Sequence, residues 1–161
     1  MQLYVLLAII FAVLALALFI TKRRFGLPTV MLAAGYVVSM QWADTVTLWM
    51  IGLGLNTAAV PLSVIVGSGL ILLPGLVLVS SGGVAKKMPL RVVGALLFGL
   101  VGCAFVAEPL LQNSVLGYDD QQAFQLFMNN TSLIVGVGIL AAWIDLVLTK
   151  TPKPPKDEGK H

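Results

Sequence analysis

The sequence predicts an all-α polytopic membrane protein, a bundle of about five transmembrane helices. The first observation is composition: 58% of the 161 residues are hydrophobic and only 11% are charged. A soluble domain carries roughly 25% charged residues, so too few charges remain to cover a surface in water. The second observation is a series of apolar runs, each close in length to the roughly 20 residues that a helix needs to cross a bilayer. Together they exclude a soluble domain, a disordered chain and a nucleic-acid-binding protein.

The first apolar run covers residues 3–20 and contains no charge. As a helix it would be about 27 Å long, close to the thickness of one hydrocarbon core. A secretory signal has basic residues before its apolar stretch and a small-residue cleavage site after it. Here the basic residues 22–24 follow the stretch. We therefore expect a retained first helix rather than a cleaved signal.

The second run, residues 25–43, is less apolar. Asp44 follows it and is a residue type that caps helix starts. Trp49 comes seven residues after Trp42, on a similar helical face, and tryptophan favours the headgroup level. We expect residues 45–55 to form a separate interfacial segment leading into the next span.

The third run covers residues 57–80 and contains Pro74-Gly75 in its last third. Proline removes a backbone hydrogen bond, so these two residues predict a kink or hinge. The fourth run, residues 92–111, is rich in glycine and has Glu108 near its far end. Each run is expected to form one span.

A polar stretch, residues 112–131, separates the fourth run from the fifth, which covers residues 132–149. Within it Asp119 and Asp120 resemble a helix start, and apolar residues follow at helical spacing, which predicts a short helix on the membrane surface. We expect one transmembrane domain over residues 1–149. Residues 150–161 are expected to form a flexible, polar, basic cytoplasmic tail.

The basic residues predict the orientation. With five crossings, all the basic clusters fall on one side of the membrane, which the positive-inside rule identifies as the cytoplasm. The chain is therefore expected in the cell (inner) membrane with its N-terminus outside and its C-terminus in the cytoplasm. The net charge of +3 then needs no nucleic-acid partner, because topology and contacts with anionic lipids account for it. The residues assigned to topology and lipid contact are Lys22, Arg23, Arg24, Lys86, Lys87, Arg91 and Lys150.

Residues with catalytic or metal-binding chemistry are scarce. The single histidine is His161, and the single cysteine, Cys103, lies within an apolar run. Nothing basic near Cys103 would favour its thiolate, so it is expected to be a packing group. The sequence thus predicts no enzyme and no cofactor. Two carboxylates, Glu108 and Asp145, fall near the ends of spans and are the candidates for ion-facing groups.

Small residues recur every fourth position in several runs, a spacing that lets helix backbones approach closely. They predict tight packing within the bundle, or against other membrane subunits or a second copy of the chain. The residues assigned to helix packing are Ser63, Gly67, Gly94, Ala95, Gly99, Gly102 and Cys103.

Two segments carry a resemblance to a known family: the basic turn Lys-Arg-Arg-Phe-Gly at residues 22–26, and Arg-Val-Val-Gly-Ala-Leu-Leu-Phe-Gly at residues 91–99. Together with the order of spans, residues 1–111 resemble the colicin V production protein family of small bacterial inner-membrane proteins. The resemblance implies a role in toxin export or envelope homeostasis and no catalytic residues. The chain departs from the family pattern where Val101, not arginine, precedes Gly102, and in its fifth run.

Three functions are compatible with these observations. The first is a non-enzymatic accessory or scaffold component of an envelope or toxin-export assembly. The second is a small channel or transporter, formed as an oligomeric pore because none of the five runs carries a convincing polar stripe. The third is a phage holin, although five spans are more than holins usually have.

Overall fold

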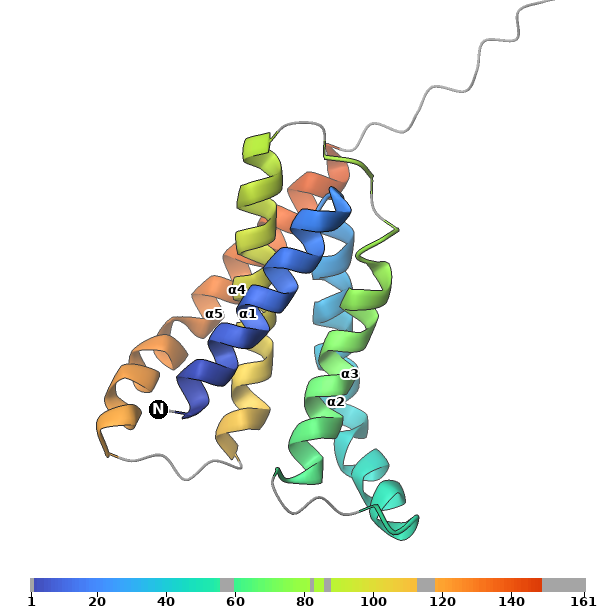
Figure 1. The fold of residues 1–161 in the computed structure, drawn as a ribbon, viewed down its shortest axis with the longest axis vertical. Helices are drawn as coiled ribbons and strands as arrows, with labels where there is room; N and C mark the ends of the chain where they lie inside the picture. The colour runs from blue at the N-terminus through green and yellow to red at the C-terminus, as the bar shows by residue number, and fades with distance from the viewer. Residues whose placement is uncertain (1, 56–59, 82, 86–87, 113–117, 149–161) are drawn as a thin grey trace, which may run out of the picture.

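The computed structural model describes residues 2–55, 60–81, 83–85, 88–112 and 118–148 (Figure 1). These residues form five α-helices and no β-strand. The helices are α1 (Gln2–Thr21), α2 (Gly26–Gly52), α3 (Leu62–Leu78), α4 (Met88–Gln112) and α5 (Tyr118–Val147). The all-α prediction is confirmed. The predicted tail, residues 150–161, lies outside the described residues.

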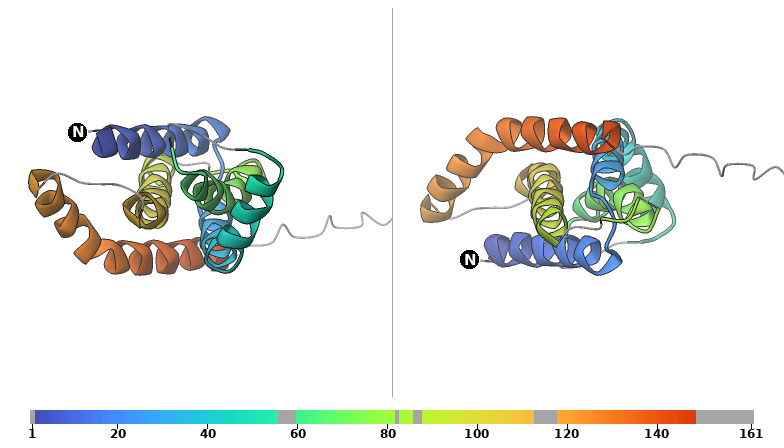
Figure 2. Two further views of the ribbon diagram at one scale, coloured as in Figure 1. Left: turned by 90° about the horizontal axis from the view of Figure 1, so that it is seen from below. Right: turned by 90° about the horizontal axis from the view of Figure 1, so that it is seen from above.

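Successive helices run in opposite directions along the bundle (Figure 1). α2 packs along α3, α1 packs along α4, and α5 contacts both α2 and α4. α4 lies between α1 and α5, as both end-on views show (Figure 2). One end of the bundle therefore holds the α1–α2 turn, the end of α3, the start of α4 and the end of α5.

The interior is apolar and centred on α4, where Phe98, Val101 and Val106 are fully buried. The outer surface is also apolar. Every helix carries large hydrophobic side chains that are more than half exposed, among them Val13, Trp42, Leu73, Val93 and Leu140. A soluble monomer rarely exposes large contiguous apolar patches, so this surface matches a lipid environment better than water.

Two stretches, Met88–Leu110 and Phe127–Val147, are long and apolar enough to cross a membrane. Val5–Thr21 and Leu62–Leu78 are apolar but shorter. α3 begins only at Leu62, directly after Pro61, and not at residue 57 as the sequence suggested. Proline has no backbone N–H to donate, which favours its place at a helix start.

The separate interfacial segment expected over residues 45–55 is wrong. α2 continues without a break to Gly52, and its 27 residues span about 40 Å. No glycine or proline occurs between residues 36 and 51, so nothing in the chain ends the ladder of backbone hydrogen bonds. Asp44 therefore lies inside the helix and caps no new one.

The separate surface helix expected within residues 112–131 is also wrong. It is the first part of α5, which runs continuously through residues 129–132. The hydroxyl of Thr131 donates to the Phe127 carbonyl over 3.1 Å, so this polar group is satisfied within the helix. α5 bends, and its N-terminal part turns away from the direction of the remainder (Figure 2). Phe127 is partly buried against the core.

Candidate functional site

A pocket of about 320 Å³ lies between α2, α3 and α4, toward the end of the bundle opposite the α1–α2 turn. It is the most distinctive polar feature of the described bundle. Its lining residues are Tyr36, Ser39, Met40, Ala43 and Asp44 from α2, Ser63, Gly67 and Ile71 from α3, and Glu108 and Pro109 from α4.

The packing of the three helices sets the shape of this pocket. Gly67 lies where the three helices meet, but a Cβ atom there would make only ordinary van der Waals contacts, 3.5 Å from Cβ of Pro109 and 3.6 Å from Oγ of Ser39. The Ser39 hydroxyl donates to the Gly67 carbonyl oxygen over 3.3 Å and joins α2 to α3. Ser63, which the sequence assigned to helix packing, lines the pocket one turn away.

Glu108 is the central charged group of the pocket. Its carboxylate accepts a hydrogen bond from the hydroxyl of Tyr36. The Tyr36 ring stacks on Phe105 with 4.8 Å between ring centroids and 26° between planes, which fixes the direction of its hydroxyl. With Asp44, the lining contains two carboxylates and no lysine, arginine or histidine. The pocket therefore presents a negative potential.

The sequence named Glu108 as a candidate ion-facing group but predicted neither this pocket nor its partners. Tyr36, Ser39 and Asp44 lie at positions i, i+3 and i+8 of one helix, so they share a face of α2. That spacing was the available signal. The boundary predicted between residues 43 and 44 hides this spacing, because it assigns Asp44 to a different segment from Tyr36 and Ser39.

Asp145, the second predicted ion-facing carboxylate, lies at the opposite end of the bundle and is buried. One of its oxygens lies 3.6 Å from Nη1 of Arg24, and the other accepts a hydrogen bond of 3.1 Å from the Gly26 backbone N–H. Gly26 is the first residue of α2, and Phe25 at the N-cap offers no side-chain cap. Asp145 thus caps α2 from another helix, and this arrangement favours a structural role.

Gly26 makes this cap possible by its small size. A Cβ atom at Gly26 would lie 2.7 Å from the Ala142 carbonyl oxygen and 3.0 Å from Oδ2 of Asp145. The start of α2 therefore rests directly on the α5 backbone. The sequence places Gly26 in the basic turn but gives no sign of this contact with a residue 119 positions away.

The basic residues that the structure describes gather at this same end. Nη2 of Arg91 donates to the Phe19 carbonyl over 2.8 Å, and its guanidinium lies 4.8 Å from the Phe19 ring centroid. The turn after α1 pairs with the segment after α3: the Arg24 N–H donates to Gly83 and the Ala85 N–H to Lys22. Arg23 forms an isolated bridge with Val84. Lys86, Lys87 and Lys150 lie outside the described residues.

The glycines assigned to α4 packing contact α1 and the turn that follows it. A Cβ atom would meet Phe25 at Gly94, Phe11 at Gly99 and Leu14 at Gly102, each at 3.0 Å or less. Ala95 is buried. The Cys103 thiol donates to the Leu7 carbonyl oxygen over 3.3 Å, so it also faces α1.

Pro74 and Gly75, expected to form a kink or hinge, lie inside α3, which continues for three residues beyond Gly75. A Cβ atom at Gly75 would lie 2.6 Å from Cδ2 of Leu32, which is itself fully buried. Gly75 therefore lets α3 approach α2 at a filled contact. A hinge at this point would have to open that contact.

Apolar side chains separate the Glu108 pocket from the Asp145 end. Leu14, Leu32, Phe98 and Val101 are buried almost completely in the middle of the bundle. Leu14 and Leu32 both reach the position where a Cβ of Gly102 would lie. Among the described residues, no group of three or more His, Cys, Asp or Glu side chains gathers to hold a metal ion.

The chain matches no family model, no curated protein and no solved structure. The resemblance to the colicin V production family therefore stays a prediction.

Proposed function

We propose that this chain is a non-enzymatic multi-pass membrane protein that crosses the inner membrane five times. In this proposal the N-terminus is outside and the C-terminus is in the cytoplasm. The chain acts as an accessory or scaffold subunit of an envelope or export assembly. The observation that carries the proposal is the outer surface, where large apolar side chains are exposed on all five helices while glycine and alanine contribute to the interior.

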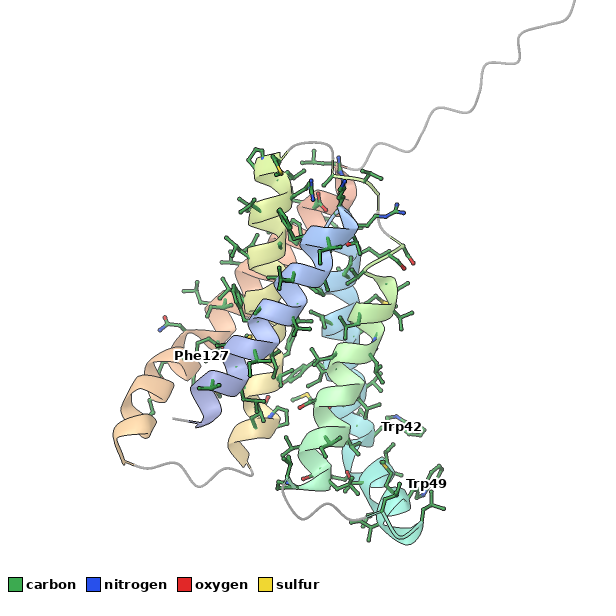
Figure 3. All side chains as sticks on the ribbon, in the orientation of Figure 1. Trp42, Trp49 and Phe127 are labelled. Atoms are coloured by element: carbon green, nitrogen blue, oxygen red, sulfur yellow. The ribbon has the colours of Figure 1, made fainter. Side chains whose placement is uncertain are left out.

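The distribution of polar residues supports the proposed orientation. Lys22, Arg24 and Arg91 lie at the end with the α1–α2 turn. Trp42 and Trp49 project from the far part of α2, toward the opposite end (Figure 3). Cytoplasmic loops are rich in lysine and arginine, and tryptophan is enriched at membrane interfaces. Met88–Leu110 of α4 and Phe127–Val147 of α5 are long and apolar enough to connect these two ends across a membrane.

The packed centre of the bundle favours a scaffold over a pore within one copy of the chain. An ion passing from Glu108 to Asp145 would have to cross the apolar layer around Phe98 and Val101. At its far end it would meet Asp145 already engaged by Arg24 and Gly26. A pore would therefore have to form between subunits.

Native mass spectrometry of the protein, purified gently from its own cells in nanodiscs, tests this proposal. A foreign subunit in fixed stoichiometry is the expected result, and its identity would name the process. A closed homo-oligomer without a foreign subunit would contradict the scaffold role and favour an oligomeric pore. Timed lysis on induced expression would instead identify a holin.

A further inference from the structure

We propose that the Glu108 pocket binds the primary ammonium group of a small organic amine at the outer face of the membrane. The proposal uses the membrane placement above but not the scaffold role. Glu108 supplies the counter-ion, Tyr36 holds the carboxylate in position, and the remaining wall accommodates a short apolar chain.

The charged side chains that line the pocket favour a cationic ligand over an anionic one. Glu108 and Asp44 line the pocket, and no basic side chain does. The hydrogen bond from Tyr36 occupies part of the acceptor capacity of the Glu108 carboxylate, which can accept several more. An ammonium group brings three donors and would form a charge-assisted hydrogen bond with this carboxylate. An anion would be repelled.

Size selects an organic cation over a bare metal ion. The pocket volume of about 320 Å³ lies at the lower end of the roughly 300–1,000 Å³ typical of small-molecule sites. A divalent metal ion such as Ca²⁺ takes six to eight oxygen ligands in direct contact with it. The described part of the chain gathers no such carboxylate cluster. Ser39 and Ser63 belong to the same lining, so their hydroxyls would lie near a bound ammonium group.

The lining also offers a place for the carbon chain of an amine. Ile71 is almost fully buried at one side of the pocket, Pro109 is half-buried beside it, and the exposed side chain of Met40 adds apolar surface at the rim. A ligand with a charged head and three to five carbons would bury its chain there while its head reaches Glu108. Of the two carboxylates in the lining, Asp44 is exposed and Glu108 is half-buried. A single half-buried carboxylate beside apolar side chains suits an amphiphilic amine better than a polyamine or a hydrated ion.

Two sources could supply this ammonium group. Glu108 lies 20 residues along α4 from Met88, or about 30 Å, which places it near the outer headgroup level in the proposed orientation. Soluble amines reach this level from outside, and so does the ammonium of a phosphatidylethanolamine headgroup. Both present the same chemistry to Glu108.

An NMR titration of the purified full-length protein in detergent tests the binding, with n-butylammonium as the probe and n-butanol as its neutral counterpart. We expect saturable shifts at pocket residues for n-butylammonium only. Glu108→Gln keeps the size of the side chain and an acceptor for Tyr36, and it should weaken binding at least tenfold. Asp145→Asn makes the same charge change at the other end and should leave the affinity within twofold.

A second variant keeps the charge but fills the space. Ala43→Phe adds a ring to the lining and should abolish binding while Glu108 stays intact. Equal affinity in wild type and Glu108→Gln, or no saturable shift with n-butylammonium, would overturn the proposal. Because this titration needs no partner protein, its failure is distinct from failure to find a foreign subunit.

Nanodiscs distinguish the two sources. Phosphatidylglycerol has no ammonium, so discs of this lipid leave the pocket open to the soluble probe. If a lipid headgroup occupies the pocket, phosphatidylethanolamine discs should block the binding of n-butylammonium. Native mass spectra should then show a lipid bound to the wild type that is missing from Glu108→Gln. Equal probe affinity in both discs identifies a soluble amine as the ligand. Absence of binding in both discs would overturn the proposal.

Discussion

The sharpest prediction concerns Gly35, where α2 and α3 touch backbone to backbone. A Cβ atom built at Gly35 would lie 2.6 Å from the Ile71 carbonyl oxygen, 2.7 Å from that of Leu70 and 3.1 Å from Cα of Ile71. All three atoms belong to the backbone, so no change of side-chain rotamer can relieve the overlap. Gly35→Ala must instead push α2 and α3 apart by roughly 0.8 Å to restore normal contact.

The expected cost follows from overpacking data. Extra methyl groups forced into a packed interior typically cost about 1–3 kcal/mol. The alanine would otherwise favour the helix over glycine by about 1 kcal/mol. We expect Gly35→Ala to lower the free energy of unfolding by about 1 kcal/mol net, which is about 2 kcal/mol below a substitution that gains the helix preference alone. The matched control is Gly69→Ala on α3, where a Cβ atom meets nothing within 4 Å and the helix preference alone remains.

Reversible unfolding in mixed micelles, followed by tryptophan fluorescence, measures both variants. Gly69→Ala should be as stable as the wild type or more stable by up to about 1 kcal/mol. The difference between the two variants is the quantity of interest, because both make the same substitution within a helix. If Gly35→Ala proved as stable as Gly69→Ala, α2 and α3 could not pack as described.

Three further predictions concern both ends of the bundle. Asp145→Asn should lower the free energy of unfolding by about 2 kcal/mol in the same assay, because the change weakens a buried cap and leaves Arg24 without its ion pair. In a double-mutant cycle, the variant that lacks both Asp145 and Arg24 should lose less free energy of unfolding than the two single variants together. Simple additivity of the two losses would contradict coupling between Asp145 and Arg24. In intact cells that carry Cys103→Ala, a membrane-impermeant maleimide should label a cysteine at Gly54 but not one at Lys22, and the reverse pattern would refute the proposed orientation.

The sequence predicted much of the local structure. Long apolar runs defined the positions of the helices, and Pro61 and the basic turn at residues 22–25 separate them. It failed where polar residues within a run resembled boundaries. A helix boundary is predicted at Asp44 and another at the end of the polar stretch, residue 131, yet both positions lie inside helices. A polar side chain interrupts hydropathy without interrupting backbone hydrogen bonding, so hydropathy alone misplaces such ends.

In the candidate site, too, the sequence indicates some residues and the packing of the helices decides the rest. Glu108 was identified from the chain because a carboxylate near the end of an apolar run is unusual. Its partner Tyr36 lies 72 residues away and meets it only through the packing of α2 against α4. Asp145 looks equivalent to Glu108 in sequence, and only its neighbours Arg24 and Gly26 distinguish this helix-capping carboxylate from the one that lines the pocket.

By itself, the sequence determined the helical class, the approximate positions of the helices and the clustering of basic residues, because hydropathy and charge act along the chain over a few turns. The tertiary structure decided which carboxylate lines a pocket, which one caps a helix and which glycines are required for close packing. These properties depend on distances between atoms of different helices. A sequence records the residue types that permit such contacts but not the register in which the helices meet.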